Sequence, residues 1–201
     1  HTGLLWTEGP GRVELLGSTR DDAAGEAFDK AAAILELGYP GGPAVERAAR
    51  QGDPAAVRLP RTLLEPESLD FSFSGIKTAL LYEARGQNAT RRSPLRAGLR
   101  VPDLAAGFEE AVVDVLVEKV RRAAARTAAP AVALGGGVAA NARLRARIRA
   151  LGDALGFEVF LPPAELCLDN AAMVAGLGYH ALVAGRIAPL DLDADPTPIR
   201  H

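Results

Sequence analysis

The chain has 201 residues, of which 48% are hydrophobic and only 5% aromatic, and its formal net charge is −2. This composition supports a packed core that is aliphatic and rich in alanine, in one large domain or two small ones. The one cysteine, Cys167, excludes an internal disulfide and fits a reducing compartment. The apolar runs are too short and too interrupted to span a bilayer, so we expect a cytoplasmic protein without a membrane partner.

The charges are unevenly distributed along the chain. Between Arg85 and Arg149 there are 13 Arg and Lys residues against 5 Asp and Glu residues, whereas the remainder is acidic. A basic middle between acidic ends is typical of a surface that binds a polyanion, and it is equally typical of a solvated surface. Charge alone therefore leaves both interpretations open.

The N-terminal part predicts a hairpin followed by two helices. Strands are expected at 1–6 and 13–16, with a Gly-Pro-Gly turn between them. A helix is expected at 23–37, a Gly- and Pro-rich break follows it, and a short helix is expected at 44–51. The first residues read as the middle of a strand, so we expect a fragment of a longer chain.

The rest of the chain predicts strands that alternate with helices, which favours an α/β domain. The best helix has apolar residues at helical spacing and carries its acids early and its bases late. The expected elements are an extended segment at 53–70, a strand at 71–74, a helix at 76–84, a loop at 85–100, the long helix at 103–128, a strand at 131–134, a helix at 142–151, a strand at 158–161, a helix at 169–183 and a polar, Pro-rich tail at 191–201.

A glycine turn, made of Gly135, Gly136 and Gly137, lies between the predicted strand 131–134 and the predicted helix 142–151. Glycines let the backbone approach a phosphate closely, and the first amides of the next helix then point at the anion. Asn141 is placed to cap that helix or to reach a ligand hydroxyl. The alternative is a tight turn that needs positive φ angles.

Two acidic motifs also leave alternatives open. Asp22, Glu26 and Asp29 fall on one face of the predicted helix, which indicates a metal, a ligand hydroxyl, a cationic partner or an acidic solvent face. Asp169 opens the last predicted helix, where it is either an N-cap, which the residues alone favour, or a ligand held at a strand–helix junction.

The segment 71–78 also leaves alternatives open. Its serines could cap a helix, and Lys77 is either a partner for a phosphate or a plain surface lysine.

Four blocks, in this order, closely resemble the bacterial tRNA adenosine threonylcarbamoyltransferases, the TsaD family, once called glycoproteases. The likeness runs from His1 to about Gly185. It implies the fold of actin, sugar kinases and Hsp70 ATPases, in which two ribonuclease-H-like lobes enclose a nucleotide and a metal. The blocks are DDAAGEAFDKAAAILELGYPGGP, LDFSFSGIKTAL, ALGGGVAANARLR and LCLDNAAMVAGLGYH.

The resemblance implies transfer of a threonylcarbamoyl group from threonylcarbamoyl-AMP to N6 of the adenosine beside the tRNA anticodon, with release of AMP. By motif, Asp29, Gly42 and Asn141 contact the substrate. Asp169 becomes a ligand of one divalent metal ion, iron or zinc. The two histidines that complete the metal site in the family, and its Ser-Gly-Gly phosphate loop, are absent from this sequence.

We therefore expect most of a C-terminal lobe at 1–190, with an insertion at about 38–100, and no activity from this chain alone. The expected partners are tRNA, the adenylate and the other proteins of the threonylcarbamoyladenosine synthesis complex. The alternatives are a non-catalytic scaffold of the same fold and a nucleotide-dependent sugar kinase. The candidates for contacts to tRNA phosphates are Arg91, Arg92, Arg96 and Arg100.

Overall fold

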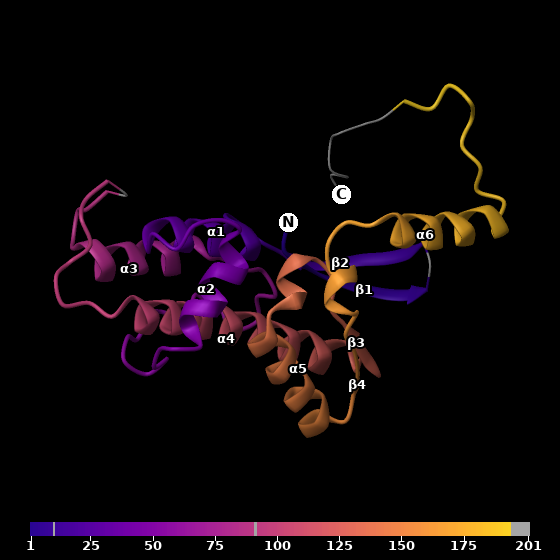
Figure 1. Cartoon of the computed structure of the whole chain (residues 1–201). Helices are drawn as coiled ribbons and strands as arrows, with labels where there is room; N and C mark the ends of the chain where they lie inside the picture. Colours follow the sequence, from indigo (N-terminus) through magenta and orange to yellow (C-terminus); the bar gives the residue numbers. More distant parts are fainter. Residues whose placement is uncertain (10, 91, 194–201) are drawn as a thin grey trace.

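The computed structural model describes residues 1–9, 11–90 and 92–193 (Figure 1). These residues form two small sheets and a group of packed helices, so the expected mixed α/β class is confirmed. The predicted tail lies mostly outside the described residues. The elements are β1 (Gly3–Gly9), β2 (Arg12–Ser18), α1 (Ala24–Ile34), α2 (Gly41–Ala49), α3 (Ser74–Arg85), α4 (Val101–Thr127), β3 (Ala131–Ala133), the 3-10 turn η1 (Gly137–Ala140), α5 (Ala142–Leu155), β4 (Glu158–Phe160), the 3-10 turn η2 (Ala164–Leu166) and α6 (Ala171–Val183).

The antiparallel hairpin of β1 and β2 confirms the two strands predicted at the N-terminus. Just past the end of β2, Thr19 forms a parallel bridge with Phe71. The strand predicted at 71–74 is wrong beyond this bridge, because α3 already begins at Ser74. The side chain of Asp21 accepts the backbone N–H of Ser74 and ends the extended segment there.

The main core lies between α1, α2, α3 and α4. Phe28 of α1 meets Phe108 of α4 edge to face, with ring centroids 5.5 Å apart. The long predicted helix is confirmed in α4, whose apolar positions pack against the other three helices. Lys119, also on α4, is fully buried, and its ammonium group donates to the carbonyl oxygens of Leu63 and Ser68 at 2.5 and 2.6 Å.

A second, smaller apolar cluster joins α4 to the unit β3–α5–β4. The strands β3 and β4 are parallel, and α5 crosses between them, as the alternation of predicted strands and helices requires. Ile148 of α5 is fully buried in this cluster. Among the described residues, this sheet and the hairpin are separate two-stranded sheets.

Helix α6 has little cover from the rest of the described chain (Figure 1). None of the residues of Ala171–Val183 is buried, although six large apolar side chains lie on the helix. They are Met173, Val174, Leu177, Tyr179, Leu182 and Val183. No helix among the described residues is long and apolar enough to cross a membrane.

Candidate functional site

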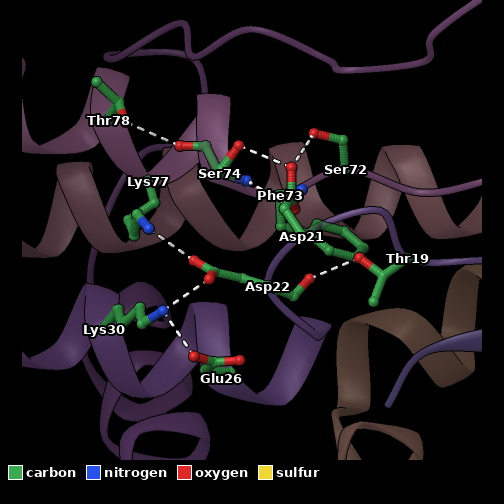
Figure 2. Close-up of polar contacts among 10 residues, drawn as sticks. All are labelled: Thr19, Asp21, Asp22, Glu26, Lys30, Ser72, Phe73, Ser74, Lys77 and Thr78. Carbon is green, nitrogen blue, oxygen red and sulfur yellow. Dashed lines mark hydrogen bonds and ion pairs between the residues drawn. The ribbon is translucent and has the colours of Figure 1, made fainter.

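Two consecutive aspartates after β2 connect α1 with α3, and Figure 2 shows the contacts. The carboxylate of Asp21 accepts the hydroxyls of Ser72 and Ser74 at 2.6 and 2.7 Å and the backbone N–H of Phe73 at 2.8 Å. Burial raises the pKa of Asp21, but the hydrogen bonds from Ser72, Phe73 and Ser74 outweigh it, so the pKa is lowered. Asp21 thus caps α3 from a distant part of the chain.

The neighbouring carboxylate of Asp22 binds two lysines. Its oxygens lie 2.6 Å from Lys30 Nζ of α1 and 2.7 Å from Lys77 Nζ of α3, and Lys30 also pairs with Glu26. Burial raises the pKa of Asp22, and hydrogen bonds from Lys30 and Lys77 lower it by more. Asp22 and Glu26 therefore have cationic partners within the chain, and Lys77 is engaged with Asp22. The predicted face of three carboxylates on one helix is wrong for Asp22, which lies before the start of α1, and Asp29 pairs with no described cation.

Asp29 lies on α1 next to Lys30, and its side chain contacts the start of α2 rather than the lysines of this cluster. Its Oδ1 accepts the backbone N–H of Gly41 at 2.8 Å, and the residue is otherwise exposed. A Cβ atom on Gly41 would lie only 2.4 Å from Asp29 Cα, whereas a Cβ on Gly42 would meet no atom within 4 Å. Gly41 is therefore needed for packing, and Gly42 faces open space.

The glycine turn leads into η1 and then α5. Gly136 has φ 82°, which favours glycine, and Cβ atoms on Gly135 and Gly136 would meet nothing within 4 Å. Asn141 is the N-cap of α5, because its Oδ1 accepts the N–H of Leu144 at 2.9 Å. Its Nδ2 donates to Glu109 Oε1 of α4 at 2.7 Å, so both ends of the buried amide are engaged within the protein.

Glu109 provides a pH-dependent test of this contact. Burial raises the pKa of its carboxyl above the ordinary 4.5, although the Asn141 hydrogen bond lowers it, so the folded state binds the proton more tightly than the unfolded state. Stability should thus fall as pH rises from the ordinary value through the folded pKa. We expect Glu109→Gln to remove this loss, because an amide does not ionise. The glutamine oxygen still accepts the hydrogen bond from Asn141, so the contact itself is kept.

Urea unfolding at several pH values measures the effect. The variant and the parent chain should agree below the ordinary glutamate pKa, and the variant should be the more stable one above the folded pKa. A stability difference between parent and variant that does not change with pH would contradict a raised pKa of Glu109 in the folded state.

The segment that carries Asp169 lies beside the glycine turn. A Cβ atom on Gly137 would come within 3.2 Å of Leu168 Cδ2. Asp169 is exposed and makes no hydrogen bond or ion pair with another described residue. The cap predicted at Asp169 is wrong by one position, because Asn170 Oδ1 accepts the N–H of Met173 and α6 begins at Ala171.

The described residues offer a metal ion only part of a site. Among the described residues, no group of three or more His, Cys, Asp or Glu side chains could hold a metal ion. The unpaired carboxylate of Asp169 has the oxygen donors that suit one ligand position of such an ion. The remaining ligands would have to come from outside the described residues.

The arginines predicted to contact tRNA differ in their surroundings. Arg91 lies outside the described residues, Arg92 is exposed, and Arg96 donates weakly to the Glu83 carbonyl at 3.4 Å. Arg100 pairs with Asp103 and also donates to a backbone carbonyl. The basic loop is anchored by buried Arg85, which donates to the carbonyls of Ile34 and Ser93.

The structure brings together some of the predicted site residues. The glycine turn, η1 and Leu168 lie side by side, and Val138 of η1 lies against Gly25 of α1. The amide of Asn141 points toward α4, and Asp29 binds the start of α2. None of the predicted site residues lines the two described pockets. Asp21, Glu109 and Arg145 are not predicted from the sequence as site residues, because their partners are distant in sequence.

Comparison with known proteins identifies the class of this chain. It belongs to the TsaD family, whose model, described as tRNA N6-adenosine threonylcarbamoyltransferase, matches residues 1–176. Proteins of that name are 51% identical in Anaeromyxobacter dehalogenans, 52% in Symbiobacterium thermophilum and 48% in Desulfitobacterium hafniense. Each match covers 98% of this chain and 57%, 55% and 56% of the relative, respectively, so the chain spans about half the length of these relatives.

Proposed function

We propose that this chain supplies part of an enzyme that transfers a threonylcarbamoyl group from threonylcarbamoyl-AMP to N6 of a tRNA adenosine, releasing AMP. The observation that carries the proposal is the likeness of about half of each relative to nearly all of this chain, under one shared name. That name favours the transferase over a sugar kinase or a non-catalytic scaffold. We further propose that the chain forms a ribonuclease-H-like lobe and works in the cytoplasm with partner proteins.

The geometry supports a role for the glycine turn at the adenylate phosphate. The space around Gly135 and Gly136 is open, so a phosphate can approach their backbone amides. Gly42 also faces open space, and Asp29 Oδ2 accepts no hydrogen bond from another described residue, so it can receive a substrate hydroxyl. Asn141 would act mainly by fixing the end of the turn, because its amide is engaged on both sides.

Asp169 would be one ligand of a divalent metal ion, iron or zinc, with the other ligands outside this chain. When bound, the metal would supply Lewis-acid polarisation of substrate oxygens, a contribution of several kcal/mol. The part of this chain is to present the unpaired carboxylate beside the turn. We expect the isolated chain to be inactive.

The test uses a full-length protein that contains this chain. Asp169→Ala should reduce both the metal content and the tRNA-dependent release of AMP. Asp191→Ala, at an exposed position after α6, is the matched control and should change neither. Unchanged metal content and transfer in Asp169→Ala would overturn the metal assignment, and phosphorylation of a sugar without need for tRNA would overturn the transferase.

The basic loop is the proposed contact to tRNA phosphates. We expect Arg92→Glu combined with Arg96→Glu to weaken tRNA binding about equally for different tRNA sequences and to reduce the salt dependence of binding by about two counterions. The measurement is tRNA affinity against salt concentration in a full-length protein. Arg149→Glu, on the exposed side of α5, is the control for charge alone. An unaltered affinity of the double variant for tRNA at low salt would exclude the basic loop as a contact to tRNA phosphates.

A further inference from the structure

Arg145 of α5 connects two segments that follow different strands. Its Nη1 donates to the carbonyl of Ala139 in η1 at 2.9 Å, and its Nη2 donates to the carbonyl of Pro162 after β4 at 2.7 Å. Nη1 also lies 3.8 Å from the sulfur of Cys167. One guanidinium group therefore binds the segment after the glycine turn and the segment before Asp169.

The other arginines of α5 do not share this arrangement. Arg143 and Arg147 pair with acidic side chains of α4, whereas Arg145 makes no ion pair with a described carboxylate. Its partners are two backbone carbonyls and a thiol. A planar guanidinium group suits this task, because its donors have fixed directions, while a lysine ammonium group is a single compact charge.

The contacts of Arg145 lie next to a close approach of the same two segments. A Cβ atom on Gly137, the last glycine of the turn, would lie 3.2 Å from the side chain of Leu168, the residue directly before Asp169. Cys167 is buried, with 4% of its surface exposed, and its thiol donates to the carbonyl of Pro163 at 3.6 Å. Beyond Asp169 the chain enters the exposed helix α6, so the contacts that hold this segment in place are concentrated before it.

We propose that Arg145 is a positioning residue, which holds the segment carrying Asp169 beside the Gly135–Gly137 turn. The role of this arrangement rests on the proposed function, in which Asp169 is a metal ligand and the turn binds a phosphate. Arg145 would then keep these two groups at one site. Arg145 itself contacts neither substrate nor metal in this proposal. Its effect is transmitted through the backbone of 162–168.

Cys167 is a built-in reporter, because it is the one cysteine of the chain and lies within the held segment. Arg145→Met keeps most of the side-chain stem but removes the donors. We expect the thiol of this variant to react with a thiol reagent faster by on the order of tenfold or more, since charged hydrogen bonds hold the segment closed. Arg145→Lys should give a smaller increase, because one ammonium group cannot span both carbonyls with the same geometry.

The matched control is Arg149→Met, one turn further along α5, where the arginine is exposed and has no described partner. Its labelling rate should equal that of the parent chain. Circular dichroism and urea unfolding establish that each variant is folded. The rate in Arg145→Met should depend only weakly on urea below the unfolding transition, as expected for local opening.

Two results would overturn the proposal. One is an unchanged labelling rate in Arg145→Met. The other is a faster rate whose urea dependence matches that of global unfolding, since this would show only a general loss of stability. The experiment needs no tRNA, adenylate or metal, so a failure to detect threonylcarbamoyl transfer counts against the proposed function and leaves this test unaffected.

Discussion

Phe108→Ala is expected to reduce the free energy of unfolding by about 3–5 kcal/mol, the usual cost of removing a buried phenylalanine. Phe108 is 0% exposed and Phe28 2% exposed, and the two rings meet edge to face where α1 crosses α4. The substitution leaves a cavity and removes this ring contact. Because a domain of this size has only about 5–15 kcal/mol of stability, this loss is a large fraction of the total.

Urea unfolding followed by circular dichroism measures the loss. Phe160→Ala is the control, because that side chain is 52% exposed on β4. It should cost no more than about 1 kcal/mol. A loss below about 1 kcal/mol in Phe108→Ala would mean that the contact between α1 and α4 is not the centre of the core.

Asp22→Ala is expected to cost about 2 kcal/mol at neutral pH. The substitution leaves Lys30 and Lys77 without their shared carboxylate (Figure 2). Losing one partner of a buried ion pair costs about 3–5 kcal/mol, and we reduce this value because both lysines retain access to water. Asp22→Asn keeps the shape but not the charge, so it should recover only part of the loss.

The pH dependence of this effect has a definite sign. Hydrogen bonds from the two lysines hold the folded pKa of Asp22 below its ordinary value despite burial. Its contribution is therefore present above the ordinary aspartate pKa and is lost as pH falls through the lowered folded pKa. The gap between parent and Asp22→Ala should close in acid, and a double-mutant cycle with Lys77→Met should show coupling at neutral pH only.

Much of the helical structure could be predicted from local sequence. The long helix α4 follows from the spacing of its apolar residues, and its observed ends differ from the prediction by only one or two positions. The start of α2 was missed, because Gly41, Gly42 and Pro43 indicate a break. Proline is nevertheless compatible with the first turn of a helix, where its missing N–H costs nothing.

The site was predictable only where its signal is local. Asn141 as a cap follows from its place before an amphipathic helix, and the structure confirms it. At Asp169 and Asn170 both residue types cap helices well, so the sequence could not choose between neighbours. The capping of α3 by Asp21 and the anchoring role of Arg145 depend on tertiary contacts, for which no spacing rule exists.

The aspartate contacts of Asp21 and Asp22 join residues far apart in the chain. Asp21 is 52 residues from Phe73, and Asp22 is 55 residues from Lys77. Closing so long a loop is entropically costly, so these contacts should form after the folding transition state. Asp22→Ala should then speed unfolding and leave the refolding rate nearly unchanged. The contacts of the aspartate pair therefore contribute to the kinetic stability of the folded protein.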